Sequence, residues 1–157
     1  MKRIIIRESA KNGFDGMMNV ARSLHPAWFD RVAINESMPI DLNVQKGYVA
    51  EDKSAIIGFV TYVSDNRNAK ISWLGILPDY QRQGIGSRLL EAVEKELRKT
   101  GVKKLRVGTV AESEKYEPYE RTRAFYRKMG FKVEKVEKAV SKDTGEKFDL
   151  ATYVKNL

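Results

Sequence analysis

A strand, a glycine-containing loop and a helix follow directly on one another within residues 71–100, and this stretch constrains the fold more than any other. Residues 71–77 are apolar and β-prone, Pro78 begins a turn, and a helix is expected to start near Gly84. The first N–H groups of a helix have no intrahelical partner, and the helix dipole is positive at that end. The stretch therefore predicts a binding site for a phosphate-bearing ligand.

The helix after this loop has the clearest hydrophobic pattern in the chain. Successive apolar residues are separated by four, one, three and four positions, which places them on one face of a helix. Basic residues near its end, followed by Gly101, are typical of a helix C-terminus. The apolar positions are Ile85, Leu89, Leu90, Val93 and Leu97.

Seven short runs rich in β-branched and aromatic residues predict strands, and four amphipathic segments predict helices. Asp15 is expected to cap the first helix, the second is expected to begin near Asp30, and Pro39 either interrupts it or starts another turn. Residues 111–120 contain Pro118 and predict a loop. The order β-α-α-β-β-β-α-β-α-β-β indicates a mixed α/β fold. The expected strands are residues 3–7, 47–50, 55–63, 70–77, 103–110, 131–138 and 147–155.

Composition limits the class of protein. A chain of 157 residues with 42% hydrophobic and 32% charged residues is expected to form a single domain over residues 1–157. No apolar run is long enough to span a membrane, and the N-terminal run ends at Arg7, so we expect no signal peptide and a cytoplasmic location. The absence of cysteine excludes disulfides and thiolate metal sites, and we expect no metal.

The net charge of +8 favours an anionic ligand or partner. The basic residues are nevertheless spread along the chain and interleaved with 21 acidic ones. This distribution is typical of a solvated surface and argues against nucleic-acid binding.

Two well-known phosphate-binding loops do not fit the residues. A Walker loop ends in Gly-Lys-Ser or Gly-Lys-Thr, which the run after Gly84 lacks. A dinucleotide-binding fingerprint needs a third glycine three residues after Gly86, where this chain has Leu89. Specific residues therefore exclude both interpretations.

Gln81, Gly84 and Gly86 fill a third pattern: Arg or Gln, two residues, Gly, one residue, and Gly or Ala. With this pattern the loop resembles the acyl-coenzyme A loop of the GNAT superfamily of N-acetyltransferases. Residues 124–131, Ala-Phe-Tyr-Arg-Lys-Met-Gly-Phe, resemble the second family signature, Ala-x-x-Phe-Tyr-x-x-x-Gly-Phe, with two fewer residues after the alanine. The two signatures occur in the family's order, and the predicted element order matches as well.

The resemblance implies a GNAT-like fold, with a central, mixed and largely antiparallel sheet of about seven strands flanked by about four helices. It also implies acetyl-CoA as the acyl donor, with the backbone around the glycine loop binding the pyrophosphate. Ile76 and its neighbours, on a strand that splays from the next one, would offer backbone hydrogen bonds to the pantetheine arm. The implied cofactor-binding residues are Ile76, Gln81, Arg82, Gln83, Gly84, Ile85, Gly86 and Ser87.

The implied activity is transfer of the acetyl group of acetyl-CoA to a primary amine by direct attack. Tyr126 occupies the position of the family's general acid, which would protonate the departing thiolate. A homodimer is also a habit of the family. The alternative is a non-catalytic coenzyme A-binding sensor or interaction module, because residues 72–74 lack the glutamate that some members carry before the loop. Another departure is Arg121, where many relatives have asparagine.

The sequence leaves the acceptor, the general base and the contacts of the nucleotide phosphate open. Glutamates before the Tyr126 helix would activate an amine through water or attract a cationic acceptor, and aromatic residues would line the cleft or pack in the core. His25 is expected to have a packing or surface role. The glutamates are Glu112, Glu114, Glu117 and Glu120, the aromatic residues are Trp28, Phe29, Tyr48, Trp73, Tyr116 and Tyr119, and the candidate phosphate contacts are Arg82, Arg88, Arg127 and Lys128.

Overall fold

The computed structural model of the protein describes residues 3–9 and 11–157. Seven strands in this part of the chain form one sheet in the order β1-β2-β3-β4-β5-β7-β6. Only the β4–β5 pair is parallel, and the other neighbouring pairs are antiparallel. The strands are β1 (Ile4–Glu8), β2 (Lys46–Asp52), β3 (Ala55–Ser64), β4 (Asn68–Ile76), β5 (Lys104–Val110), β6 (Lys132–Val140) and β7 (Lys147–Asn156).

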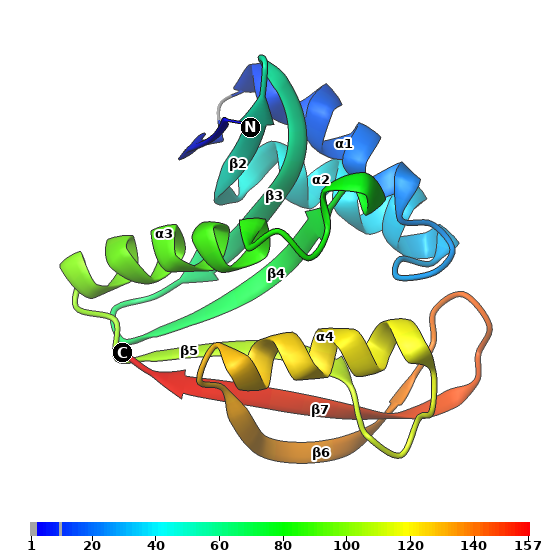
Figure 1. Ribbon diagram of the computed structural model, residues 1–157. Coiled ribbons are helices and arrows are strands. Elements are labelled where there is room, and N and C mark those ends of the chain that lie inside the picture. The colour runs from blue at the N-terminus through cyan, green and yellow to red at the C-terminus, as the bar shows by residue number, and fades with distance from the viewer. Residues whose placement is uncertain (1–2, 10) are drawn as a thin grey trace.

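Four α-helices cover the two faces of this sheet (Figure 1). They are α1 (Phe14–Ser23), α2 (Met38–Val44), α3 (Ile85–Lys99) and α4 (Glu117–Lys128). The predicted fold class, a mixed and largely antiparallel sheet flanked by four helices, is confirmed. Each predicted strand also ends within two residues of the observed one.

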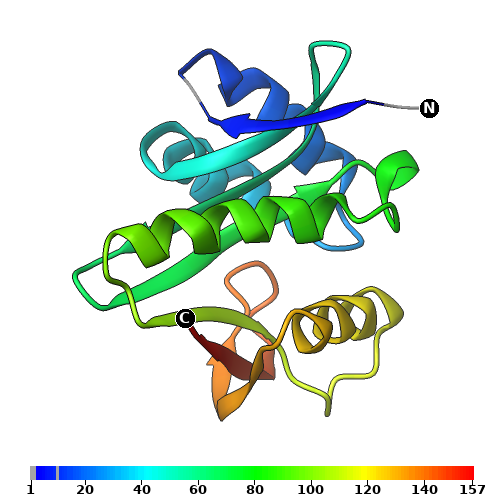
Figure 2. The same cartoon turned by 60° about the vertical axis from the view of Figure 1, so that its left-hand side comes forward.

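Two hydrophobic cores hold the helices against the sheet. The apolar stripe of α3 is fully buried in the larger core, to which α4 contributes Tyr126. Helix α3 lies across strands of the first half of the sheet (Figure 2). The smaller core joins α1 and α2 to β2 and β3 through residues such as Met17, Leu42 and Phe59. Burial of the predicted stripe thus explains why the segment after the glycine loop is helical.

Three local predictions are corrected or resolved by the structure. Asp15 lies inside the first turn of α1, where a negative charge is favourable, and Gly13 is the N-cap, so the predicted cap is wrong. Asp30 does cap the second helical segment, because its Oδ1 accepts a hydrogen bond from the Ala33 N–H at 2.8 Å. A π-helical turn, Ala33–Ser37, leads into α2, whose first turn contains Pro39.

Helix α4 begins earlier than the sequence indicated. The predicted loop over residues 111–120 ends at Tyr116, and Pro118 lies in the first turn of the helix. Proline suits this place because the first helical N–H groups have no intrahelical partner to lose. The connection between β5 and α4 is therefore short, and the last residues of the predicted loop belong to α4.

The sheet opens between β4 and β5. These two strands pair only from Asn68 to Ile71 on β4, opposite residues 104–107 of β5, although both strands continue beyond. Figure 1 shows the two strands diverging from their shared end. The splay that the resemblance implied is therefore present, and it leaves backbone groups at the end of β4 without a partner strand.

Candidate functional site

The backbone of the glycine loop includes positive φ angles, which residues other than glycine rarely adopt. Gly84 is the N-cap of α3 and has φ of +79°, and Arg82 has φ of +63°. A Cβ on Gly86 would lie 3.3 Å from Cε1 of Phe125, so the absence of a side chain lets α3 approach α4. Glycine is thus favoured at these two positions for different reasons: Gly84 has a left-handed conformation, and Gly86 lies at a close contact between helices.

The N-terminus of α3 presents unpaired amides in front of this loop. The Arg88 N–H donates to the Gly84 carbonyl at 3.1 Å, which is the first bond of the helix. The N–H groups of Ile85, Gly86 and Ser87 therefore have no intrahelical partner. No acidic side chain lies in the first turn. This arrangement of amides suits an anion.

Backbone groups near the end of β4 point into the opening between the strands. The Leu77 N–H bonds the Ile57 carbonyl, and hydrogen-bonding direction alternates along an antiparallel pair. The polar groups of Leu74 and Ile76 therefore point away from β3, toward the diverging β5. The Ile76 carbonyl already accepts a bond from Nε2 of Gln81 at 3.0 Å, which ties the loop to the strand.

Tyr126 lies on α4, which packs against β5, and is almost completely buried in the larger core, with 3% of its surface exposed. Its ring makes edge contacts with Phe125 and Phe131, at centroid distances of 5.1 and 5.4 Å. Burial disfavours the phenolate and raises the pKa of Tyr126 above its ordinary value of 10. The hydroxyl therefore stays protonated throughout the neutral range.

A cavity of about 460 Å³ opens where β4 and β5 diverge. Trp73 of β4 and Val110 of β5 line it from either side of the opening, and Tyr119 lines it from α4. The turn between β6 and β7 forms another wall, and Asp143 of this turn pairs with Arg31 at 3.0 Å.

Helix α4 connects the cavity with the glycine loop. Tyr119 and Tyr126 are seven residues apart, which places them on the same helix face at a separation of roughly 10 Å along the axis. Phe125 touches the position of Gly86 at the other end. Helix α4 therefore extends from the contact at Gly86 to the cavity wall at Tyr119.

Of the four glutamates considered from the sequence, only Glu114 lines the cavity. Glu112 forms an ion pair with Arg127, and Glu117 forms one with Arg121. Glu120 is exposed on α4 outside the cavity lining. Pairing with arginine thus accounts for two of these carboxylates, and the segment before α4 directs a third into the cavity.

The aromatic candidates also divide. Trp73 and Tyr119 line the cavity, while Phe29 and Tyr116 contact them edge-on at 5.7 and 4.6 Å. The other two pack against the cores, Trp28 against the smaller and Tyr48 against the larger. His25 lies outside the cavity lining, and its Nδ1 is 3.0 Å from the Phe29 carbonyl.

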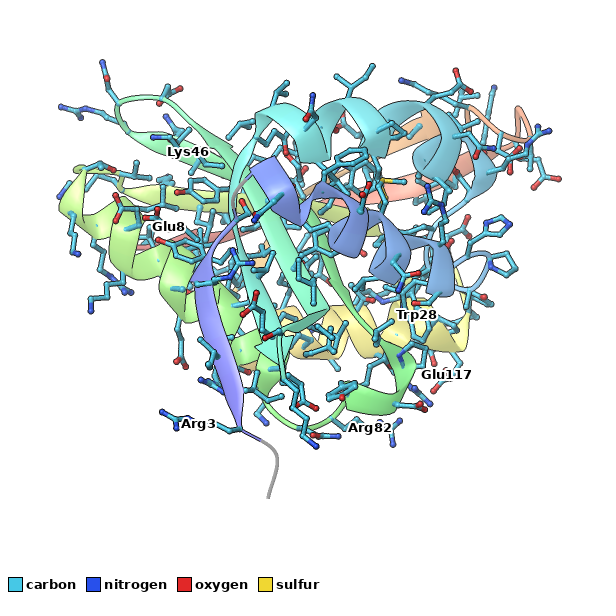
Figure 3. The ribbon with its side chains drawn as sticks, turned by 90° about the horizontal axis from the view of Figure 1, so that it is seen from above. Arg3, Glu8, Trp28, Lys46, Arg82 and Glu117 are labelled. Atoms are coloured by element: carbon cyan, nitrogen blue, oxygen red, sulfur yellow. The ribbon has the colours of Figure 1, made fainter. Side chains whose placement is uncertain are left out.

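The basic candidates near the glycine loop differ in their interactions and in their exposure. Arg88 donates to the Ile4 carbonyl at 3.0 Å, and Arg127 pairs with Glu112. Arg82 and Lys128 are exposed. Figure 3 shows Arg82 on the loop that leads into α3, at the edge of the molecule.

Sequence reasoning missed Arg123, which is 2% exposed on α4. Its guanidinium donates to the carbonyls of Val110 and Ala111 at 2.8 and 3.0 Å, and to that of Glu114 at 3.3 Å. The signal was its position three residues before Tyr126, on the helix face that turns inward. Because Arg123 is positively charged, the sequence does not distinguish it from the exposed basic residues of α4.

The chain shares a domain with a known family. A family model described as an acetyltransferase (GNAT) domain matches residues 44–133, which is more than half of the chain. The chain belongs to this family of acetyl-CoA-dependent N-acetyltransferases. The predicted family, the predicted enzyme class and the predicted donor, acetyl-CoA, are thereby confirmed. No curated protein matches the sequence significantly.

Solved structures with the same fold cover nearly the whole chain. Ard1 from Thermoplasma volcanium is 16% identical, with a TM-score of 0.77, and the match covers 98% of this chain and 97% of that one. The ribosomal-protein-S18-alanine N-acetyltransferase from Escherichia coli is 19% identical, with a TM-score of 0.76 and coverage of 98% and 94%. A GNAT family acetyltransferase from Elizabethkingia anophelis with acetyl-CoA bound is 21% identical, with a TM-score of 0.69 and coverage of 98% of both chains. At this level of identity, the likeness establishes the fold.

Two further properties concern the described residues as a whole. They contain no cluster of three or more histidine, aspartate or glutamate side chains arranged to hold a metal ion. None of their helices has the length and the apolar character that a membrane crossing requires.

Proposed function

We propose that the protein transfers the acetyl group of acetyl-CoA to a primary amine by direct attack, with Tyr126 as the general acid. The observation that carries this proposal is the order of three features: the glycine loop, the opening beside Tyr126, and the cavity. A donor bound along the loop and β4 would bring its acetyl group to the opening, and an acceptor in the cavity would face it there.

The proposed donor site consists of the α3 N-terminus and the end of β4. The amides of residues 82–87 would bind the pyrophosphate, and the left-handed Gly84 aims them at it. The proposed set is Ile76, Gln81, Arg82, Gln83, Gly84, Ile85, Gly86 and Ser87. Gln81 acts by holding the Ile76 carbonyl, and the remaining outward groups of β4 would bind the pantetheine amides.

Acetyl-CoA supplies an activated thioester, and the chain supplies the groups that guide its reaction. A backbone N–H of Leu74 or Ile76 would polarise the thioester carbonyl. The amine nitrogen bonds to the acetyl carbon while the carbon–sulfur bond breaks, and the Tyr126 hydroxyl gives its proton to the departing sulfur. The attacking nitrogen loses a proton to water or to a carboxylate, and Tyr126 regains its proton from solvent, so that the charges balance.

A primary amine is favoured as the acceptor because carboxylates line the cavity. Asp30, Glu114 and Glu146 lie in its wall together with two lysines, Lys142 and Lys147, so acidic residues outnumber basic ones there and would attract an ammonium group. One protein of similar structure is described as acting on an alanine of ribosomal protein S18, which is also an amine substrate. Trp73 and Tyr119 would contact the apolar part of the acceptor.

The first experiment is a panel of primary amines assayed by release of free thiol from acetyl-CoA. The panel contains a peptide with N-terminal alanine, lysine methyl ester, spermidine and an aminoglycoside. We expect saturable transfer to at least one amine and identification of an N-acetyl product by mass spectrometry. Binding of acetyl-CoA in calorimetry without transfer to any amine would support the sensor hypothesis instead.

Glu114→Gln is expected to raise the KM of the best acceptor in this panel about tenfold, because a charge-assisted hydrogen bond to an ammonium group is lost. The Kd of acetyl-CoA should not change, since Glu114 lies at the cavity and not at the glycine loop. Glu120→Gln is the matched control, because Glu120 carries the same charge on α4 outside the cavity lining. Equal effects of the two substitutions would show a general effect of charge and contradict a local role.

A further inference from the structure

Arg123 is a buried cation whose guanidinium bonds only main-chain oxygens. It is 2% exposed, and no ion pair of Arg123 with a carboxylate is present in the described part of the chain. Burying a charge is unfavourable unless hydrogen bonds compensate for the lost water. Side chains that merely pack a helix are normally apolar, so a role in packing alone does not account for an arginine here.

The three hydrogen bonds of Arg123 all go to one short segment. Its Nη1 donates to the carbonyls of Val110 and Ala111, and its Nη2 donates to that of Glu114. The segment from Val110 to Glu114 leaves β5 and supplies two residues to the cavity wall. Arginine can satisfy three carbonyls at once because its guanidinium is a rigid fork with five donors.

Arg123 lies on α4 between residues that belong to the site, and its hydrogen bonds link α4 to the segment from Val110 to Glu114. It follows Tyr119 by four residues and precedes Tyr126 by three, so all three lie on one helix face. Tyr119 lines the cavity, and Tyr126 is buried in the larger core. One side chain therefore connects the face that bears the proposed acid with the segment that bears Glu114.

We infer that Arg123 is a positioning residue, which holds the Val110–Glu114 wall of the cavity at a fixed place relative to Tyr126 and so sets the affinity for the acceptor. The inference rests on the proposed function, because it takes the cavity as the acceptor site. Arg123 itself does not reach the reacting atoms and acts through Glu114.

The test compares Arg123→Met, Arg123→Lys and Arg121→Met with the wild-type enzyme. Methionine keeps much of the side-chain volume but leaves three carbonyls without donors, and lysine keeps the charge without the fork. Arg121→Met is the matched control, because Arg121 is exposed on the same helix and pairs with Glu117 instead. Each variant is assayed with acetyl-CoA and the fastest acceptor of the amine panel, and its Kd for acetyl-CoA is measured by calorimetry.

Arg123→Met is expected to raise the KM of the acceptor about tenfold or more and to leave the Kd of acetyl-CoA within about twofold. Arg123→Lys should show an intermediate KM, and Arg121→Met should show the wild-type KM. In an enzyme that already carries Glu114→Gln, Arg123→Met should add about threefold or less, because both changes remove the same interaction.

The competing explanation is that Arg123 only stabilises the fold. In that case Arg123→Met would lower the fraction of active protein and hence the maximal rate. The KM of the acceptor and the Kd of acetyl-CoA would stay at the wild-type level, and this result would overturn the inference. Full additivity with Glu114→Gln would overturn it as well. If Arg123→Met does not fold, the KM obtained with Arg123→Lys decides. Failure of the wild-type enzyme to acetylate any amine would instead reject the proposed function on which the inference depends.

Discussion

Tyr126→Phe is expected to lower kcat about 100-fold, because it removes the only proton donor that we place beside the departing sulfur. The Kd of acetyl-CoA should stay within about twofold, since the proposed pyrophosphate site is at the α3 N-terminus and the phenyl ring preserves the packing. Steady-state kinetics with the best amine of the panel gives kcat, and calorimetry gives the Kd.

The buried position of Tyr126 also predicts the pH dependence of the wild-type enzyme. Burial raises the pKa of Tyr126 above 10, the ordinary value for tyrosine. The hydroxyl therefore remains protonated at pH values up to 10 and above. An acid with a raised pKa loses its proton only at a higher pH than usual. We therefore expect no alkaline decline of kcat attributable to Tyr126 up to about pH 10. An acid limb at lower pH would report deprotonation of the acceptor amine or of a carboxylate.

Tyr153→Phe is the matched control for this substitution. Tyr153 is also buried, and its hydroxyl has no hydrogen-bond partner among residues 3–9 and 11–157. Removing an unsatisfied buried hydroxyl is neutral or stabilising, so Tyr153→Phe should retain wild-type kcat. If Tyr126→Phe retained it too, Tyr126 would be a packing residue and the mechanism would need another acid.

The glycine loop was predictable because its signals are local. The left-handed conformation of Gly84, the orphan amides of α3 and the apolar stripe behind them all follow from residues close in sequence. The strands were predictable for the same reason. The splay between β4 and β5 came only from the resemblance, because pairing depends on strands far apart in the chain.

The cavity and Arg123 were not predictable in this way. The cavity wall combines Asp30, Trp73, Glu114 and the β6–β7 turn, whose spacing in sequence carries no signal of proximity. Arg123 looks like a surface residue in sequence because α4 is rich in arginine and lysine. The start of α4 was missed because Pro118 was interpreted as a loop residue, although the first helical turn is a place that proline favours.

Gly84→Val is expected to weaken binding of acetyl-CoA by about 10- to 100-fold. A β-branched residue strongly disfavours φ of +79°, so only a small fraction of the free enzyme would keep the loop in the conformation that we propose for pyrophosphate binding. The apparent affinity falls by that fraction. At saturating acetyl-CoA, kcat should remain near the wild-type value, which is the opposite of the pattern expected for Tyr126→Phe.

Gly101→Val separates this local effect from a loss of stability. Gly101 has φ of +85° at the other end of α3, and a Cβ would meet no heavy atom within 4 Å at either glycine. The two substitutions therefore introduce similar backbone strain into the same helix, and their melting temperatures should fall by similar amounts. Only Gly84→Val should change the Kd of acetyl-CoA in calorimetry. A comparable change with Gly101→Val would mean that the strain acts through the stability of α3, and unchanged affinity with both would remove the amides after Gly84 from the pyrophosphate site.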